Sequence, residues 1–223
     1  MNTIEIELRY EILNPEALHV VENTCSFISE KRVVDQYLDT PWIHLLKKGI
    51  YIRVRDSKKM DIKFNRECLI NPLLELQDSC EEYTFPLPLQ NASIDSCNEI
   101  LTFLELQPLT SPDLELFKEH NQLFNHRVVD KIRKTYTTNG FTIMVDTVAD
   151  LGSFLEIEVM ASPSENVEAV AQRMREYILS LNALHLKPLK TGYDSLILRK
   201  HKYSEYIQGR FILEEDKHDR TAL

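Results

Sequence analysis

The chain has 223 residues, of which 43% are hydrophobic, so it is long enough to bury one sizeable core or two small ones. Its formal net charge of -9 argues against a general binder of nucleic acid or of anionic membranes, because such surfaces reward a positive field. An anionic ligand would therefore need a local basic pocket.

The four cysteines are widely spread without a C-x-x-C pair, which favours neither a zinc knuckle nor a redox motif. The first ten residues carry charges and lack the apolar core of a signal peptide, and no run reaches the ~20 apolar residues of a membrane span. We therefore expect a cytoplasmic protein with no membrane or nucleic-acid partner.

The first half of the chain predicts strands joined by helices. Apolar and charged residues alternate over 4–12, which is the pattern of a strand with one charged face. An amphipathic helix is expected from Pro15 to about Glu30. Further strands are expected at 33–39, 50–56, 61–66 and 83–89, residues 66–82 have the pattern of an irregular loop, and helical spacing returns at about 94–106 and 113–121.

The second half begins with two β-rich runs, 126–138 and 141–148. They flank Asn139-Gly140, and Asn-Gly between such runs predicts a hairpin. Another strand is expected at 153–160, and amphipathic helices follow at about 164–181 and 191–201. We expect one domain over 1–203, followed by a charged tail over 204–223 that is a candidate for disorder.

Charged residues share a parity along the expected strands. Residues two apart point to the same side of a sheet, so Glu5, Glu7 and Arg9 share a face. The other sets are Arg53 with Arg55, Lys131 with Arg133, Glu156 with Glu158, and Lys63 with Asp61, while Asp146 lies on the hairpin arm opposite Lys131 and Arg133. A sheet face that meets water is one explanation. However, carboxylate pairs and basic pairs lie on different strands, which favours a face that meets a ligand.

If helices and loops cover the apolar faces, the charged faces turn inward, and closing the sheet makes a barrel lined with both signs. Unpaired charges in such a space cost several kcal/mol each unless water, metal and a polyanion fill it. Paired glutamates supply hard oxygen ligands for Mg²⁺ or Mn²⁺. Arginines and lysines clamp phosphates. The residues therefore predict a filled site for a metal and a phosphoryl chain.

The opening Glu5-Ile6-Glu7-Leu8-Arg9 resembles the E-x-E-x-K signature of CYTH domains, also called triphosphate tunnel metalloenzymes. These include thiamine triphosphatases, inorganic tripolyphosphatases, class IV adenylate cyclases and fungal-type RNA triphosphatases. Later segments appear in family order: Tyr37-Leu38-Asp39-Thr40-Pro41, Ile52-Arg53-Val54-Arg55, Lys63, Lys131-Ile132-Arg133-Lys134-Thr135-Tyr136, Asp146 before Gly152, Phe154-Leu155-Glu156-Ile157-Glu158, and Lys190 before Tyr193. The resemblance covers nearly the whole chain. It implies an α+β fold, a closed eight-stranded antiparallel β-barrel with helices packed outside.

The resemblance also implies residue roles. Mg²⁺ or Mn²⁺ would be bound by Glu5, Glu7, Asp146, Glu156 and Glu158. The triphosphate would be held by Arg53, Arg55, Lys131, Arg133 and Lys190, and the catalytic set would be Glu5, Glu7, Arg9 and Lys63. The chemistry would be attack on a phosphorus atom by metal-oriented water.

Several positions depart from the family pattern, among them the segment from Ser79 to Tyr83, which has Glu81 and Glu82 but no arginine where the family often carries one. Arg9 replaces the signature lysine, which keeps the charge but stays protonated. Met60 occupies the region where thiamine triphosphatases carry a tryptophan, and Val33-Val34 stands where cyclases carry a His-Phe pair. We therefore expect a metal-dependent hydrolase of tripolyphosphate, thiamine triphosphate or a nucleoside triphosphate, as a monomer or homodimer. A class IV adenylate cyclase making cyclic AMP, and a non-catalytic polyphosphate- or nucleotide-binding module, are the alternatives.

Overall fold

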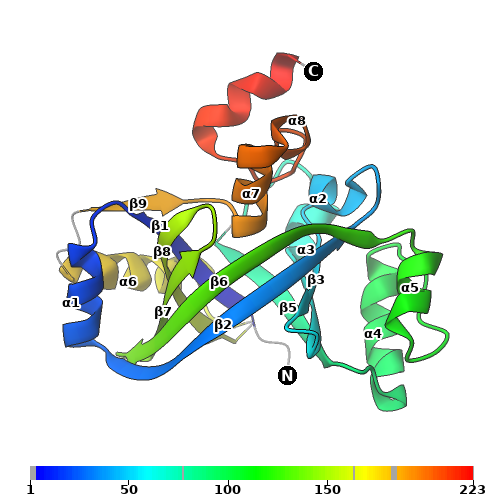
Figure 1. Ribbon diagram of the computed structural model, residues 1–223, viewed down its shortest axis with the longest axis horizontal. Helices are drawn as coiled ribbons and strands as arrows, with labels where there is room; N and C mark the ends of the chain where they lie inside the picture. The colour runs from blue at the N-terminus through cyan, green and yellow to red at the C-terminus, as the bar shows by residue number, and fades with distance from the viewer. Residues whose placement is uncertain (1–3, 77, 163, 182–184, 223) are drawn as a thin grey trace.

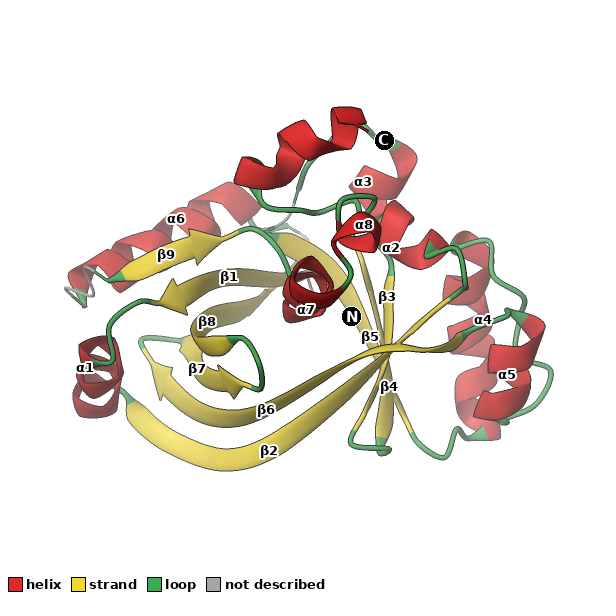
Figure 2. Cartoon of the chain, turned by 45° about the horizontal axis from the view of Figure 1, so that its top comes forward, coloured by secondary structure: helices red, strands yellow, loops and turns green. Residues whose placement is uncertain are grey.

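A closed antiparallel sheet forms the body of the protein (Figures 1 and 2). The computed structural model describes residues 4–76, 78–162, 164–181 and 185–222. Eight strands close in the order β1-β8-β7-β6-β2-β3-β4-β5, and β5 pairs back to β1, where Glu5 is the partner of Cys80. A ninth strand, β9, pairs with β1 further along, beyond its contact with β5. The predicted eight-stranded barrel is confirmed, with one strand added.

The strands differ greatly in length. They are β1 (Ile4–Ile12), β2 (Ser26–Asp39), β3 (Tyr51–Arg55), β4 (Lys59–Phe64), β5 (Ser79–Pro86), β6 (Phe124–Thr138), β7 (Phe141–Val148), β8 (Gly152–Ala161) and β9 (Leu186–Leu189). The two longest, β2 and β6, pair with each other along their lengths and form the long ribbon in front in Figure 1. The predicted hairpin joins β6 to β7, and both Asn139 and Gly140 adopt positive φ, as a type I′ turn requires.

The helices lie around the barrel. They are α1 (Glu16–Thr24), α2 (His44–Lys48), α3 (Arg66–Ile70), α4 (Asn91–Phe103), α5 (Leu114–His120), α6 (Val167–Ser180), α7 (Tyr193–His201), α8 (Tyr203–Tyr206) and a 3-10 segment, η1 (Glu214–Ala222). Among the helices of the described residues, none combines the length and apolar character needed to cross a lipid bilayer.

Two apolar clusters hold helices against the outside of the sheet. Helices α4 and α5 cover β3 and β4, where Ile52 and Ile62 are fully buried. Helices α1 and α6 cover β1, β7 and β8, where Ile6 and Ile157 are fully buried against Met174. Each such side chain contributes roughly 1.5–3 kcal/mol by leaving water. Because the strands alternate, this outward burial directs their charged residues into the barrel.

The structure differs from two predicted elements and adds one strand that was not predicted. The helix expected to reach residue 30 ends at Thr24, because Ser26 already begins the long ladder between β2 and β6. The loop expected over 66–82 contains α3, which the Asn65 side chain caps, and the first half of β5. Strand β9 had no predicted counterpart. In each case pairing between distant strands outweighs the local pattern.

The C-terminal segment, a candidate for disorder in the sequence, is folded over residues 204–222. Tyr206 and Ile212 are 1% exposed and pack in a cluster with Leu46 of α2 and Leu198 of α7. Arg220 donates hydrogen bonds to three backbone carbonyl groups of the same segment. The segment therefore lies over α7 and α2 at one end of the barrel (Figure 1).

Candidate functional site

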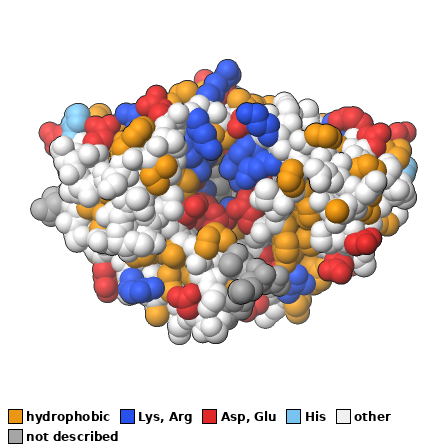
Figure 3. All heavy atoms as spheres, turned by 90° about the horizontal axis from the view of Figure 1, so that it is seen from below, with side chains coloured by type: hydrophobic (Ala, Val, Ile, Leu, Met, Phe, Trp, Pro, Cys, Tyr) orange, Lys and Arg blue, Asp and Glu red, His pale blue; other side chains and the backbone are white. Residues whose placement is uncertain are grey.

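The barrel encloses a cavity of about 340 Å³. Seen from below, lysine, arginine, aspartate and glutamate side chains gather in one hollow (Figure 3). All the residues that the sequence placed at the site line this cavity except Asp146, which is fully buried behind it. Predicted residues from five strands of the barrel, and from the loop before α7, are thus brought together.

Opposite charges face each other across neighbouring strands. Arg53 on β3 is the direct partner of Asp61 on β4, and Arg9 on β1 is the direct partner of Glu156 on β8. Their side chains meet, with Arg53 Nε 3.0 Å from Asp61 Oδ2 and Arg9 Nε 2.7 Å from Glu156 Oε1. The segregation of charges onto different strands therefore becomes ion pairing between strands.

A group of three carboxylates breaks this rule. One oxygen from each of Glu5, Glu7 and Glu158 lies within 4.8 Å of the other two. Glu7 and Glu158 are direct partners on β1 and β8, and like charges placed opposite each other destabilise a sheet. Glu158 has no hydrogen bond or ion pair with another described residue, and burial together with Glu7 raises its pKa. Three hard oxygen donors suit Mg²⁺ or Mn²⁺, so the donor set fits the predicted metal.

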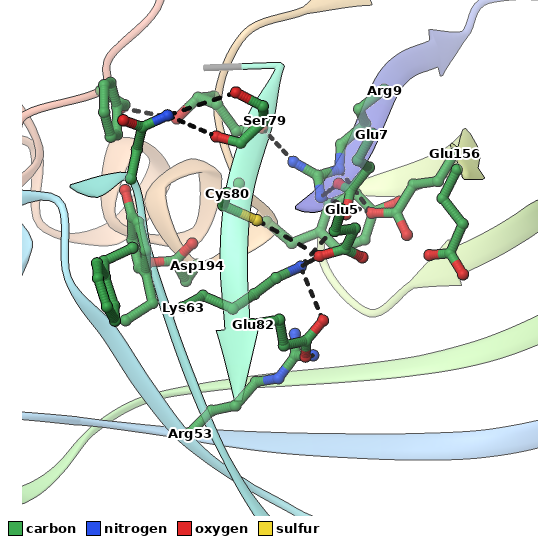
Figure 4. Close-up of a pocket in the computed structure, with 18 of the residues that line it drawn as sticks. Glu5, Glu7, Arg9, Arg53, Lys63, Ser79, Cys80, Glu82, Glu156 and Asp194 are labelled. Atoms are coloured by element: carbon green, nitrogen blue, oxygen red, sulfur yellow. Dashed lines mark hydrogen bonds and ion pairs between the residues drawn. The ribbon is translucent and has the colours of Figure 1, made fainter. Parts of the chain in front are cut away.

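Glu5 is the most deeply placed of the three, at 4% exposure. Lys63 Nζ lies 2.5 Å from Glu5 Oε2, and Cys80 Sγ donates to the same oxygen at 3.4 Å (Figure 4). Burial, with Glu7 and Glu82 adding to it, raises the pKa of Glu5 to about 8 despite the opposing charge of Lys63. A divalent cation beside this carboxylate would offset that cost.

The other two predicted metal ligands are bound by cations in this structure. Asp146 accepts a hydrogen bond from Lys131 Nζ at 2.9 Å and one from Arg133 Nε at 2.7 Å. Glu156 accepts from Arg9 and Arg133. Although burial opposes it, these two arginines hold the pKa of Glu156 well below its usual range. The structure thus separates Asp146 and Glu156 from the three-carboxylate group.

The basic side chains differ in how tightly they are held. Lys131 is 3% exposed, and burial with the neighbouring charge of Arg133 lowers its pKa to about 8. Arg55 is fixed by Asp35 through bonds of 2.6 and 2.9 Å. Lys190 is exposed at the cavity edge and makes no ion pair with another described residue. It is therefore the most adaptable of the predicted phosphate ligands.

One counter-charge of the cavity, Glu82, was not expected from the sequence. Glu82 on β5 lies 3.1 Å from Arg53 Nη2 and 3.5 Å from Lys63 Nζ. Its inward position was not predicted because residues 66–82 had the pattern of a loop. The period-two series Cys80, Glu82, Thr84 was the signal that could have placed it on an inward face.

Helix α7 closes in on the cavity from one end. Its neighbouring loop is held by Arg9, which donates from Nη1 to the Thr191 carbonyl oxygen at 2.7 Å. Asp194 is paired with the buried Arg127 of β6 at 3.1 Å. A Cβ on Gly192 would lie 2.4 Å from an Asp194 carboxylate oxygen, so glycine is required for this approach. The ring of Tyr193, the residue between Gly192 and Asp194, lines the cavity and is buried.

The protein is thus a closed antiparallel tunnel barrel whose interior holds a carboxylate group beside buried cations. The family model of the CYTH domain matches residues 3–187, and the chain belongs to this family, whose members include triphosphatases and adenylate cyclases. The predicted family is therefore confirmed.

Several solved structures share the fold. The PH1819 protein from Pyrococcus horikoshii OT3 is 20% identical with a TM-score of 0.63, and the match covers 88% of this chain and 99% of that one. A candidate adenylate cyclase from Vibrio parahaemolyticus is 19% identical with a TM-score of 0.54, covering 88% and 99%. HpAC1 from Hippeastrum, described as a candidate adenylyl cyclase with a dominant triphosphatase activity, is 14% identical with a TM-score of 0.55, covering 89% and 95%. No curated protein matches the sequence.

Proposed function

We propose that the protein is a divalent-metal-dependent hydrolase of inorganic or organic triphosphates. The observation that carries this proposal is the direct contact between the carboxylate group and the basic lining. Lys63 Nζ lies 2.5 Å from Glu5 and 3.5 Å from Glu7. A metal held by these carboxylates would therefore adjoin a phosphate held by the lysine. The triphosphatase activity described for HpAC1, which has the same fold, agrees with this proposal.

The metal would be held by Glu5, Glu7 and Glu158. When bound, Mg²⁺ or Mn²⁺ supplies charge neutralisation on phosphate oxygens and orients water. Asp146 and Glu156 would act indirectly, by positioning the cations that face the substrate. Removing Asp146 would leave the buried Lys131 without its ion-pair partner, and removing Glu156 would leave Arg133 with Asp146 alone.

The triphosphate would be held by Arg53, Arg55, Lys63, Lys131, Arg133 and Lys190. Five of these six cations are already fixed by carboxylates, as Arg55 is by Asp35. Cations that are positioned before the substrate arrives lose little freedom on binding and need no reorganisation during reaction. Positioning and charge neutralisation are most of what phosphoryl transfer requires.

Arg9 has a holding role in this arrangement. Its guanidinium contacts Glu7, Glu156 and the Thr191 carbonyl group at once. A lysine has a single ammonium group and no planar fork, so it could not hold all three with the same geometry. Arg9 would therefore orient Glu7 for the metal and fix the loop before α7.

The test is to incubate the protein with tripolyphosphate, thiamine triphosphate and ATP in Mg²⁺ or Mn²⁺, and to assay phosphate, pyrophosphate and cyclic AMP. We expect metal-dependent release of phosphate. Pyrophosphate together with cyclic AMP would instead identify a cyclase, and binding without any product would identify a binding module.

A double variant tests the carboxylates. Glu5→Gln with Glu7→Gln keeps the shape of both side chains but removes their charges, so metal-dependent turnover should be abolished. The control is Glu11→Gln, which changes the same strand outside this cavity. Turnover of the double variant within about tenfold of wild type, ~1.4 kcal/mol in barrier height, would contradict the assigned role.

A further inference from the structure

Tyr193, the first residue of α7, has a polar group without a partner. Its side chain lines the cavity and the residue is 4% exposed. Among the described residues, none accepts a hydrogen bond from its hydroxyl group or donates one to it. Buried polar groups are nearly always hydrogen-bonded, and an unpaired one costs free energy. This hydroxyl group therefore points to a partner that binds in the cavity.

The ring cannot easily turn to seek another partner. It packs against Phe154 with ring centroids 4.9 Å apart. The Arg9 guanidinium carbon and Lys131 Nζ lie 4.5 and 4.7 Å from its centroid. The next residue along the chain, Asp194, is fixed by its buried ion pair with Arg127. The unpaired hydroxyl group is thus a property of a fixed side chain.

The charges around this ring suit an anionic ligand. Arg9, Lys131 and Arg133 all belong to the basic part of the cavity, and the charges of Arg9 and Arg133 reach the hydroxyl group. Burial, together with Glu156, raises the pKa of Tyr193 well above its usual range, so the hydroxyl group stays protonated and remains a donor. A phosphate oxygen is an acceptor of the kind that these cations attract.

We propose that Tyr193 contacts the substrate, its hydroxyl group donating a hydrogen bond to a nonbridging oxygen of the phosphate that lies nearest α7. This inference rests on the proposed function, because it names a further contact of the same site. The contact comes from outside residues 3–187, the part of the chain that the family model matches. It would make placement of α7 a condition for binding the triphosphate.

The test is Tyr193→Phe, which removes only the hydroxyl group. We expect kcat/KM for tripolyphosphate with Mn²⁺ to fall at least about tenfold, since a hydrogen bond to a charged group is lost. The rise in Tm caused by tripolyphosphate should shrink as well. The Tm of the ligand-free variant should equal or exceed that of wild type, because an unpaired buried hydroxyl group has been removed.

Tyr206→Phe is the matched control. The Tyr206 hydroxyl group donates to Asp216 and accepts from the Leu213 N–H, both at 2.8 Å, and it lies outside the cavity. Its loss should lower Tm and leave kcat/KM within twofold. The two tyrosines thus separate a ligand contact from a structural hydrogen bond.

Each outcome decides something. If Tyr193→Phe retains kcat/KM within twofold and the same ligand-induced rise in Tm, the contact does not exist. If the wild type hydrolyses no triphosphate, but tripolyphosphate raises its Tm and the variant loses that rise, the contact stands and the proposed hydrolase fails. A wild type that is neither active on tripolyphosphate nor stabilised by it overturns both.

Discussion

Glu158→Gln perturbs the three-carboxylate group without removing a structural hydrogen bond. The Glu158 side chain has no hydrogen bond or ion pair with another described residue, whereas Glu5 is paired with Lys63 and Glu7 with Arg9. Glutamine keeps the shape of the side chain and removes its charge. Any change in metal response therefore reports on Glu158 as a ligand.

The expected effect on stability has an unusual sign. Two unit charges at 4.8 Å, the upper limit of the oxygen separations within this group, repel by about 3.5 kcal/mol at an effective dielectric constant of ~20 and by about 0.9 kcal/mol at ~80. Lys63 and Arg133 offset part of the repulsion that Glu158 receives from Glu7. We therefore expect the metal-free variant to be more stable than wild type by about 1 kcal/mol.

The assay has two parts, both at pH 8. Urea unfolding in EDTA gives the free energy of unfolding without metal. Initial rates of tripolyphosphate hydrolysis against Mn²⁺ concentration give the half-saturating metal concentration, which should rise at least about tenfold because one charged ligand is lost. Glu11→Gln should change neither quantity.

One result would refute this reasoning. If Glu158→Gln proved less stable than wild type in EDTA, and its Mn²⁺ dependence were unchanged, then Glu158 would have a structural partner and no metal role. The proximity of Glu5, Glu7 and Glu158 would then result from strand register alone and would not mark a metal site.

Further expectations concern the basic lining and α7. Arg53→Ala should raise KM for tripolyphosphate at least about tenfold, and a steady-state KM within twofold of wild type would place this guanidinium away from the phosphates. Burial opposes ionisation of Asp35, but Arg53 and Arg55 outweigh it and lower the pKa of this carboxylate from 3.8 to about 2. The stability that Asp35 confers is therefore fully present above its unfolded pKa and is lost as the pH falls through its folded pKa. The advantage of wild type over Asp35→Asn in urea unfolding should shrink by about 1 kcal/mol between pH 6 and pH 3, and a pH-independent difference would refute this. Asp194→Asn should lower the free energy of unfolding by about 3–5 kcal/mol, because it leaves Arg127 buried with a weaker partner, and a urea-measured loss below about 1 kcal/mol would count against the pair.

Strand parity made the inward faces of several strands predictable. In a strand the direction of a side chain depends only on whether its position is odd or even. The sequence alone therefore placed Glu5 and Glu7 on one face of their strand, and Glu156 and Glu158 on one face of theirs. The same reasoning failed where the alternation is interrupted. Residues 66–82 contain α3 before β5 begins, so Glu82 was not recognised as an inward residue. The short β9 contains Pro188 and has too few residues for a pattern.

The sequence by itself determined which residues share a face, and hence that acid and base would meet inside a closed sheet. Only the tertiary structure decided which cations each carboxylate meets, and that Glu5, Glu7 and Glu158 form one group. The register of β1 against β8 places Arg9 opposite Glu156 and Glu7 opposite Glu158. Arg9 and Glu156 are 147 residues apart, and that pairing is decided by the packing of the whole barrel, which no local pattern encodes.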